Sequence, residues 1–217
     1  MGYQGDFKNL LKMYRLTKVT TRAATLRVLK PVTGSPRVSL PVWQHGTRYA
    51  TRALSTSRPL MDRAKDAQSH LDLGTEYLNK GSIDMAMNSY HQSVQIAPSS
   101  AGYFNIGICY FQMGKHKDAI QAFEKSLGLQ PHNADAHTNI ANCYLMLKDI
   151  KSGVKHLEQA TNFNPLDGEA QYNLGCVYDA MGETDKALLR LQMASDAGIA
   201  MATKKLKQVK AKAAKQG

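Results

Sequence analysis

The chain has 217 residues and a formal net charge of +11, and that charge is distributed unevenly. Residues 1–58 contain eleven lysines and arginines and one acid, residues 59–196 contain eleven basic and sixteen acidic residues, and residues 197–217 contain six lysines and no acid. The positive charge therefore belongs to the two ends and not to the body, so it does not by itself indicate a nucleic-acid-binding protein.

The first 58 residues are rich in arginine, serine and threonine, which is the composition of a mitochondrial transit peptide. Residues 7–16 place Phe7, Leu10 and Tyr14 on one face of a helix and the cations elsewhere, as in a helix that adsorbs to an anionic surface. A later stretch resembles the sites that mitochondrial processing peptidases cut, and it contains Arg52, Leu54, Ser55 and Ser57. We expect residues 1–58 to be a cleaved, largely disordered presequence and the mature protein to lie in the mitochondrial matrix. A basic arm that binds RNA is the alternative.

One pattern then occurs four times between residues 67 and 200, at a spacing of 33 or 34 residues. Each unit has a large aliphatic residue followed by a small one, and these small residues are Gly74, Gly107, Ala141 and Gly175. A tyrosine stands three residues later, at Tyr77, Tyr110, Tyr144 and Tyr178. A second small residue and a large one follow, and three units end on proline, at Pro98, Pro131 and Pro165. This pattern resembles the tetratricopeptide repeat.

The resemblance implies two helices in each unit, over residues 67–80 and 83–97, 100–113 and 116–129, 134–147 and 150–163, and 168–181 and 184–197. Glycine accepts the left-handed conformation that ends a helix, and it stands at Gly81, Gly114 and Gly182. Lys148 takes this place in the third unit, where we expect a different turn. Stacked units share one core. We therefore expect an all-α protein, an α-solenoid of four repeats over residues 67–198, divided into 67–99, 100–133, 134–167 and 168–198.

Residues 199–217 are predicted to form a lysine-rich capping helix and tail. Ile199, Thr203, Leu206 and Val209 recur at helical spacing and can pack inward, which covers the open end of the last repeat. The lysines are expected to face outward, among them Lys204, Lys205, Lys207 and Lys210. Contact of this helix with phosphate gives the alternative function, a ribosome- or RNA-associated protein.

The candidate binding surface is implied by the repeat family, in which the first helices of successive repeats line a concave groove. The residues just before each aliphatic–small pair are Asp72, Asn105, Asn139 and Asn173. Their carboxamides resemble the asparagine ladder in the repeat domain of O-linked N-acetylglucosamine transferase, because each can donate to and accept from a peptide backbone. Asparagine is also common at this position in repeats generally, so a structural role is the alternative. The remaining predicted lining residues are Phe104, Thr138, Asn142 and Tyr172.

The expected partner is a protein or peptide segment of neutral or basic character. Repeat proteins that hold the acidic C-termini of Hsp70 and Hsp90 use lysine and arginine on their first helices. Here Leu71 or Phe104, and Asp135 or Glu169, occupy the corresponding places, so this chain does not resemble that group. The acidic residues on the first helices favour a basic or neutral ligand instead.

Cysteine and histidine spacing indicates no disulfide framework and no metal site. The three cysteines form no CxxC pair, and His132 and His137 lack a third ligand. Cys109 and Cys143 fall where a small side chain packs, so we expect them in the core. Cys176 sits one place earlier in its helix, which makes it the best of the three candidates for a reactive thiol, but we expect it too to be a core residue.

No pattern indicates catalysis, and we expect no enzymatic activity and no cofactor. The carboxylates of Asp179 and Glu183 are spaced as on one helix face, where a solvated charged surface is the ordinary explanation. We therefore expect a protein-interaction module, an adaptor or assembly factor for a larger mitochondrial complex.

Overall fold

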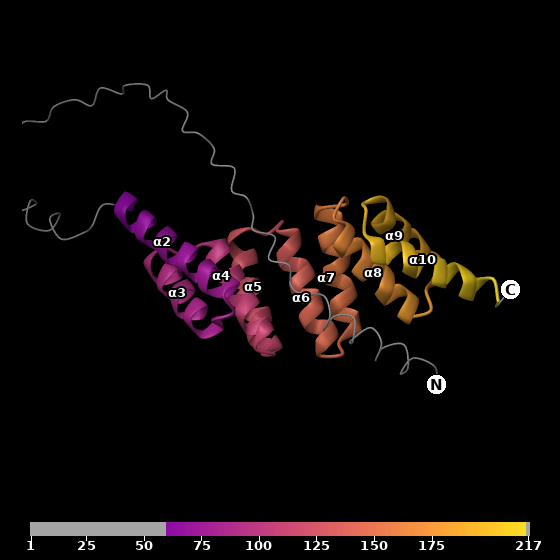
Figure 1. The fold of residues 1–217 in the computed structure, drawn as a ribbon, viewed down its shortest axis with the longest axis horizontal. Helices are drawn as coiled ribbons and strands as arrows, with labels where there is room; N and C mark the ends of the chain where they lie inside the picture. The colour runs from indigo at the N-terminus through magenta and orange to yellow at the C-terminus, as the bar shows by residue number, and fades with distance from the viewer. Residues whose placement is uncertain (1–59, 216–217) are drawn as a thin grey trace, which may run out of the picture.

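Only α-helices occur in residues 60–215, which the computed structural model describes (Figure 1). They are α2 (Leu60–Asn79), α3 (Ile83–Ile96), α4 (Ser100–Gln112), α5 (His116–Leu129), α6 (Ala134–Met146), α7 (Ile150–Phe163), α8 (Gly168–Ala180), α9 (Thr184–Asp196) and α10 (Ala200–Ala213). Each first helix packs on the second helix of its own repeat, and each second helix packs on the next repeat. The predicted all-α solenoid is confirmed. The expected presequence and its cleavage residues (Arg52, Leu54, Ser55, Ser57) lie outside the described residues.

One large side chain on the second helix of each repeat packs against the first helix. These side chains are Tyr90, Phe123, Leu157 and Leu191, and all four are fully buried. A Cβ atom added to Gly107 would lie only 2.6 Å from the Phe123 ring, and one added to Gly74 would lie 2.6 Å from the Tyr90 ring. Since no side chain fits at that distance, glycine at these positions sets how closely the two helices approach.

In the third repeat the two helices approach as closely, but the glycine lies on the second helix and not on the first. Ala141 occupies the first-helix position, and Gly153 on α7 replaces the alanine that the other repeats carry. A Cβ atom added to Gly153 would lie 2.8 Å from Cδ2 of Leu145 and 3.4 Å from the carbonyl oxygen of Ala141. Each repeat therefore pairs one glycine with one alanine between its helices.

The turn inside the third repeat does not differ from the others, so that expectation was wrong. Lys148 adopts φ 65°, close to the φ 74° of Gly114 and the φ 79° of Gly182. The hydrogen bonds also correspond, since the amide of Lys148 donates to the carbonyl of Leu145 at 3.0 Å, as Gly114 does to Phe111. The repeat architecture imposes the turn, and Lys148 accepts a backbone conformation that costs an L-residue roughly 1–2 kcal/mol.

Replacing Lys148 with glycine should therefore raise the free energy of unfolding by roughly 0.5–1 kcal/mol, because relief of the left-handed strain exceeds the extra chain entropy of glycine. Chemical denaturation measures this change. The matched control is Gly114→Lys, which creates the same strain in the second repeat and should lower the free energy of unfolding by a similar amount. Unchanged stability in both variants would contradict the account.

The first helix begins at Leu60, earlier than the predicted start at residue 67. Its added turns are held against the end of α3, because an Nη2 group of Arg63 donates to the carbonyl oxygen of Ile96 at 3.0 Å. The Ser93 hydroxyl donates to the carbonyl oxygen of Ala67 at 2.8 Å. A cationic side chain that binds the last carbonyls of a neighbouring helix stabilises both ends, and no repeat pattern reports such a contact.

The C-terminal helix α10 covers the last repeat as expected, through Ala202, Leu206 and Val209, which are buried. Thr203 is exposed instead, and its hydroxyl is 2.7 Å from the hydroxyl of Ser195. Lys205 also differs from expectation, because it does not point freely outward. Its ammonium lies 2.6 Å from a carboxylate oxygen of Asp179, whose side chain is only 12% exposed.

The expectation that Asp179 belongs to a solvated charged face was wrong. Asp179 instead anchors the capping helix α10. Lys212 reaches the other carboxylate oxygen of Asp179 at 3.6 Å, so one carboxylate on α8 holds two lysines of α10. A charged group left half-buried without its partner is costly. The ion pair fixes where α10 lies on the fourth repeat.

Replacing Asp179 with alanine should loosen α10 and increase tryptic cleavage at its lysines several-fold, because Lys205 loses its counter-ion. Limited proteolysis with mass spectrometry measures this. The control is Glu183→Ala, which removes the exposed ion pair with Lys186 at 3.0 Å and should leave cleavage unchanged. Equal cleavage of the two variants would contradict the anchoring role.

Candidate functional site

The first helices of the four repeats, α2, α4, α6 and α8, succeed one another along the long axis of the molecule (Figure 1). The four residues that precede the aliphatic–small pairs all reach the surface. Asp72 is exposed, and Asn105, Asn139 and Asn173 are half-buried. The repeat thus places one polar side chain at the same position of each first helix, as predicted.

These polar side chains differ in how much of their hydrogen-bonding capacity the protein uses. Asp72 accepts from Nε2 of Gln68 at 2.8 Å. Nδ2 of Asn139 donates to the carbonyl oxygen of Asp135 at 2.8 Å. The side chains of Asn105 and Asn173 have no hydrogen bond to any residue within 60–215. Within residues 60–215, two half-buried carboxamides therefore have no hydrogen-bond partner, and the oxygen of a third has none.

Helix α6 carries two further polar atoms without partners, at the centre of the row. Oγ1 of Thr138 and Oδ1 of Asn142 are buried and receive no hydrogen bond from the described part of the chain. Such atoms cost roughly 1–3 kcal/mol each when left unpaired. The two residues lie one helical turn apart on α6, and because both oxygens are buried, a ligand could reach them only after the neighbouring side chains move.

The predicted aromatic lining is only partly accessible. Phe104 is half-buried, with its ring centroid 5.4 Å from that of Phe123, and it offers an apolar face. Tyr172 is 6% exposed and belongs to the core, where burial raises the pKa of its phenol well above its usual range. Tyr172 therefore contributes almost no surface to the site.

The three cysteines are all in the core. Cys109 and Cys143 are fully buried as expected, and Cys176 is 2% exposed. Burial raises the pKa of the Cys109 and Cys143 thiols to about 12 and that of Cys176 to about 11. A buried thiol of high pKa is not a nucleophile at neutral pH, so Cys176 is a core residue, as expected.

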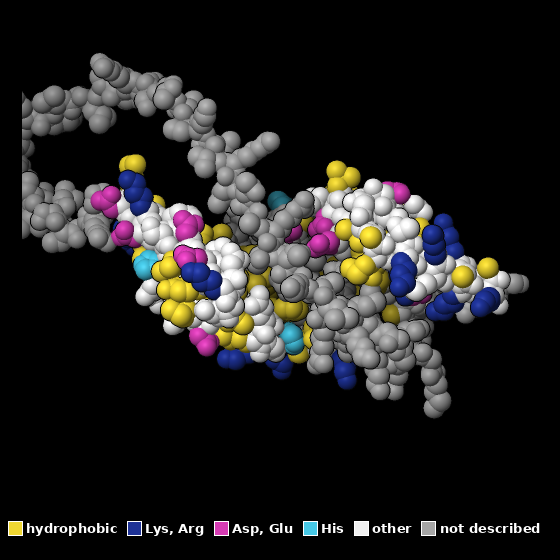
Figure 2. Space-filling model, in the orientation of Figure 1, with side chains coloured by type: hydrophobic (Ala, Val, Ile, Leu, Met, Phe, Trp, Pro, Cys, Tyr) yellow, Lys and Arg dark blue, Asp and Glu magenta, His cyan; other side chains and the backbone are white. Residues whose placement is uncertain are grey.

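Positive charge is absent from the first helices of repeats two to four. Helices α4, α6 and α8 contain no lysine or arginine, and their carboxylates are those of Asp135, Glu169 and Asp179. Asp135 and Glu169 are exposed, whereas Asp179 binds Lys205. Figure 2 shows the opposite character at the C-terminal end, where blue lysine side chains gather over α10. The first-helix surface thus repels anions and the capping helix attracts them.

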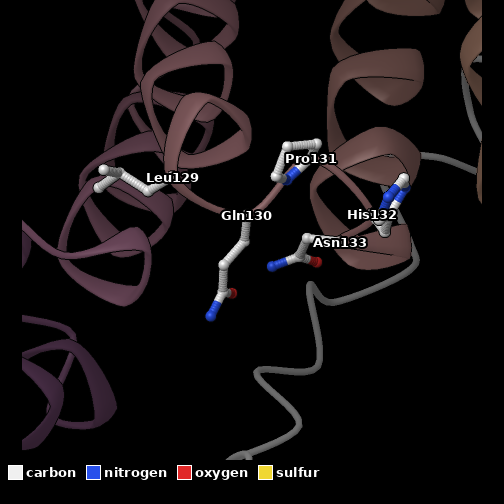
Figure 3. A pocket seen from close by; sticks show the side chains of 5 residues that line it. All are labelled: Leu129, Gln130, Pro131, His132 and Asn133. Carbon is white, nitrogen blue, oxygen red and sulfur yellow. The ribbon is translucent and has the colours of Figure 1, made fainter.

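A shallow hollow of about 470 Å³ lies at the loop between repeats two and three (Figure 3). Its lining residues are Leu129, Gln130, Pro131, His132 and Asn133. Among the described residues that line the hollow, His132 is the one titratable side chain, and these residues include no acid–base or nucleophile pair.

Sequence reasoning missed a histidine pair beside this loop. Nδ1 of His137 on α6 lies 3.1 Å from Nδ1 of His156 on α7. The signal that could have found this pair is its spacing of 19 residues, which joins equivalent positions of the two helices of a repeat. Gln171 and Arg190 have the same spacing in repeat four and are hydrogen-bonded at 3.2 Å.

No group of three potential metal ligands occurs in residues 60–215. Within the same range, every helix is too short or too polar to cross a membrane.

Comparisons with known proteins agree with this arrangement. Family models described as tetratricopeptide repeat match residues 71–134, 110–172 and 169–195. No curated protein matches the sequence. A crystal structure of MamA protein is 25% identical, with a TM-score of 0.57, over 70% of this chain and 87% of that chain.

Two other solved structures carry peptide sites. YrrB, described as a TPR protein with an unusual peptide-binding site, is 20% identical with a TM-score of 0.55, over 69% of this chain and 84% of that chain. The first TPR of Spaghetti, bound to an HSP90 peptide, is 22% identical with a TM-score of 0.51, over 54% of this chain and 94% of that chain. At these identities the likeness establishes the fold.

Proposed function

Because the chain belongs to the tetratricopeptide repeat family, we propose that it is a non-catalytic interaction module that binds an extended polypeptide segment along its first helices. One observation carries this proposal. Asn105 and Asn173 stand at the same position of their repeats, and neither carboxamide has a partner within residues 60–215. Such side chains suit a peptide backbone, which offers a donor and an acceptor at every residue.

The partner segment is proposed to be neutral or basic. Exposed Asp135 and Glu169 stand on first helices that have no lysine or arginine in repeats two to four. A cationic segment therefore gains from the local potential, and an acidic one is repelled. The HSP90 peptide that occupies the Spaghetti repeat carries three acidic residues and represents the opposite ligand class.

The proposed cellular role is an adaptor or assembly factor for a mitochondrial complex, located in the matrix. The basic, acid-poor composition of residues 1–58 supports this location, together with the processing-like stretch around Leu54. The test is affinity purification of the tagged full-length protein from nuclease-treated mitochondria, with mass spectrometry of its partners and of its own N-terminus.

Two outcomes of that purification are distinguishable. A bait that begins shortly after Leu54, with the subunits of one complex enriched, supports the adaptor and identifies its partner. A bait that retains Met1, or that is found outside mitochondria, overturns the location while leaving the binding surface to be tested separately.

A second candidate function, association with RNA or a ribosome, is favoured by one observation on α10. Lys204, Lys207 and Lys210 are exposed and have no carboxylate partner among residues 60–215, whereas Lys205 is neutralised by Asp179. Free ammonium groups on a rigid helix suit phosphate. Changing these three lysines to glutamate should abolish ribosome or RNA association under this candidate, and should leave polypeptide binding unchanged under the first.

A further inference from the structure

The imidazoles of His137 and His156 form a hydrogen-bonded pair in the middle of the solenoid. Their Nδ1 atoms are 3.1 Å apart, and Nε2 of His137 lies 3.3 Å from the carbonyl oxygen of Pro131. Since a carbonyl oxygen only accepts, His137 carries its proton on Nε2, and its Nδ1 accepts. His156 then donates from Nδ1. With His137 donating from Nε2 and His156 donating from Nδ1, each ring has one defined donor in these contacts.

Aromatic rings enclose the pair on both sides. His156 stacks on Tyr144, with centroids 5.6 Å apart and planes 25° from parallel. His137 is 6% exposed and contacts Phe163, at a centroid distance of 5.4 Å, and Phe163 contacts His132 at 4.7 Å. This row of rings joins α6, α7 and the loop that carries Pro131 and His132. Figure 3 shows the side chains of that loop.

A positive charge on the pair is disfavoured at this place. Burial lowers the pKa of His156 to about 4, and His137 and Lys155 act in the same direction. Burial also lowers the pKa of His137; the Pro131 carbonyl opposes that shift, and His132 adds to it. Among the described residues, no carboxylate and no titratable group on the neighbouring helices α5 and α8 contributes to the shift of either histidine pKa. The nearby carboxylate of Glu158 on α7 accepts a hydrogen bond from the Tyr178 hydroxyl at 2.6 Å.

We propose that the His137–His156 pair is a pH-sensitive latch, which holds α6, α7 and the loop between repeats two and three together in neutral solution and releases them in acid. If both rings are protonated, each Nδ1 carries a hydrogen, and the 3.1 Å contact is lost. A single added proton places a cation between the aromatic rings beside Lys155. Either step opposes the closed arrangement.

The sign of the pH dependence follows from the lowered pKa values. The folded pair binds fewer protons than the unfolded chain between the ordinary histidine pKa of about 6.5 and the value of about 4 for His156. The stabilisation is thus fully present above about pH 6.5 and is lost progressively as the pH falls toward 4. The latch affects the binding surface because Thr138 and Asn139 directly follow His137. That consequence rests on the proposed function, whereas the latch itself does not.

Hydrogen–deuterium exchange of the full chain at about pH 7.5 and about pH 5, corrected for intrinsic exchange rates, tests the latch. Residues 131–163 should exchange roughly tenfold faster or more at the lower pH, relative to α2, α3, α9 and α10. In His156→Gln this segment should already exchange faster at about pH 7.5 and should respond little to acid. The control is His116→Gln on α5, another partly buried histidine, which should keep the wild-type response.

Three results would overturn the latch. At about pH 5 the exchange rate could rise equally in all repeats, or it could fail to rise in residues 131–163. The third is that His116→Gln removes the rise in residues 131–163. If His156→Gln does not fold, an NMR titration of the wild-type histidine rings replaces it. His137 and His156 should then titrate together and well below pH 6.5, and titration near the ordinary histidine value would overturn the proposal.

Discussion

Replacing Phe123 with alanine should lower the free energy of unfolding by roughly 3–5 kcal/mol, the largest loss expected from a single change in this chain. The ring is fully buried and fills the space between α4 and α5, against Gly107, and its centroid lies 5.4 Å from that of the tilted Phe104 ring. Urea unfolding followed by circular dichroism measures the loss. A change below about 1 kcal/mol would show that the ring does not hold this repeat together.

A double-mutant cycle tests the physical reason behind that loss. Gly107→Ala alone should cost roughly 1–3 kcal/mol, because its new methyl group would lie 2.6 Å from the ring. Combining it with Phe123→Leu recreates the alanine–leucine pair of repeat three, Ala141 and Leu157, and should cost less than the two single changes together. Simple additivity would contradict the close-contact explanation.

The second large effect concerns binding. Replacing Asn105, Asn139 and Asn173 together with alanine should weaken the complex with the partner segment roughly 100-fold or more, since each lost carboxamide removes about 1 kcal/mol or more of hydrogen bonding. Isothermal titration with the partner peptide measures the change. Thermal stability should stay the same or rise, because alanine is the better helix former and, of these three side chains, only that of Asn139 is hydrogen-bonded within residues 60–215.

The matched control for this variant places the same kind of change on the second helices. Asn88, Gln121 and Asn162 are exposed amides on α3, α5 and α7. Their combined replacement by alanine should leave the affinity unchanged. A comparable loss of affinity from both triple variants would show that the first helices are not the specific binding surface.

Much of the fold could be predicted because the repeat pattern reports contacts that are local in sequence. Gly107 and Phe123 belong to one helical hairpin, so their spacing alone predicts the close helix approach. The row of asparagines is predictable for the same reason, since the spacing of 33 or 34 residues places each at the same point of its helix.

The remaining features depend on contacts that the pattern does not contain. The turn at Lys148 is imposed by the helices on either side, which outweigh the preference of lysine itself. Asp179 and Tyr172 were expected at the surface, but the capping helix supplies Lys205 to Asp179, and tertiary packing encloses the ring of Tyr172. The histidine pair required knowing which faces of α6 and α7 meet.

Site-specific photo-crosslinking tests the central claim, that partner segments bind along the first helices. A photoreactive amino acid is placed at Asn139 on α6 in one protein and at exposed Gln121 on α5 in another, and each is expressed and irradiated in cells of the source organism. The account predicts a partner crosslink from position 139 and little from position 121. Equal crosslinking from both positions, or crosslinking from 121 alone, would contradict it.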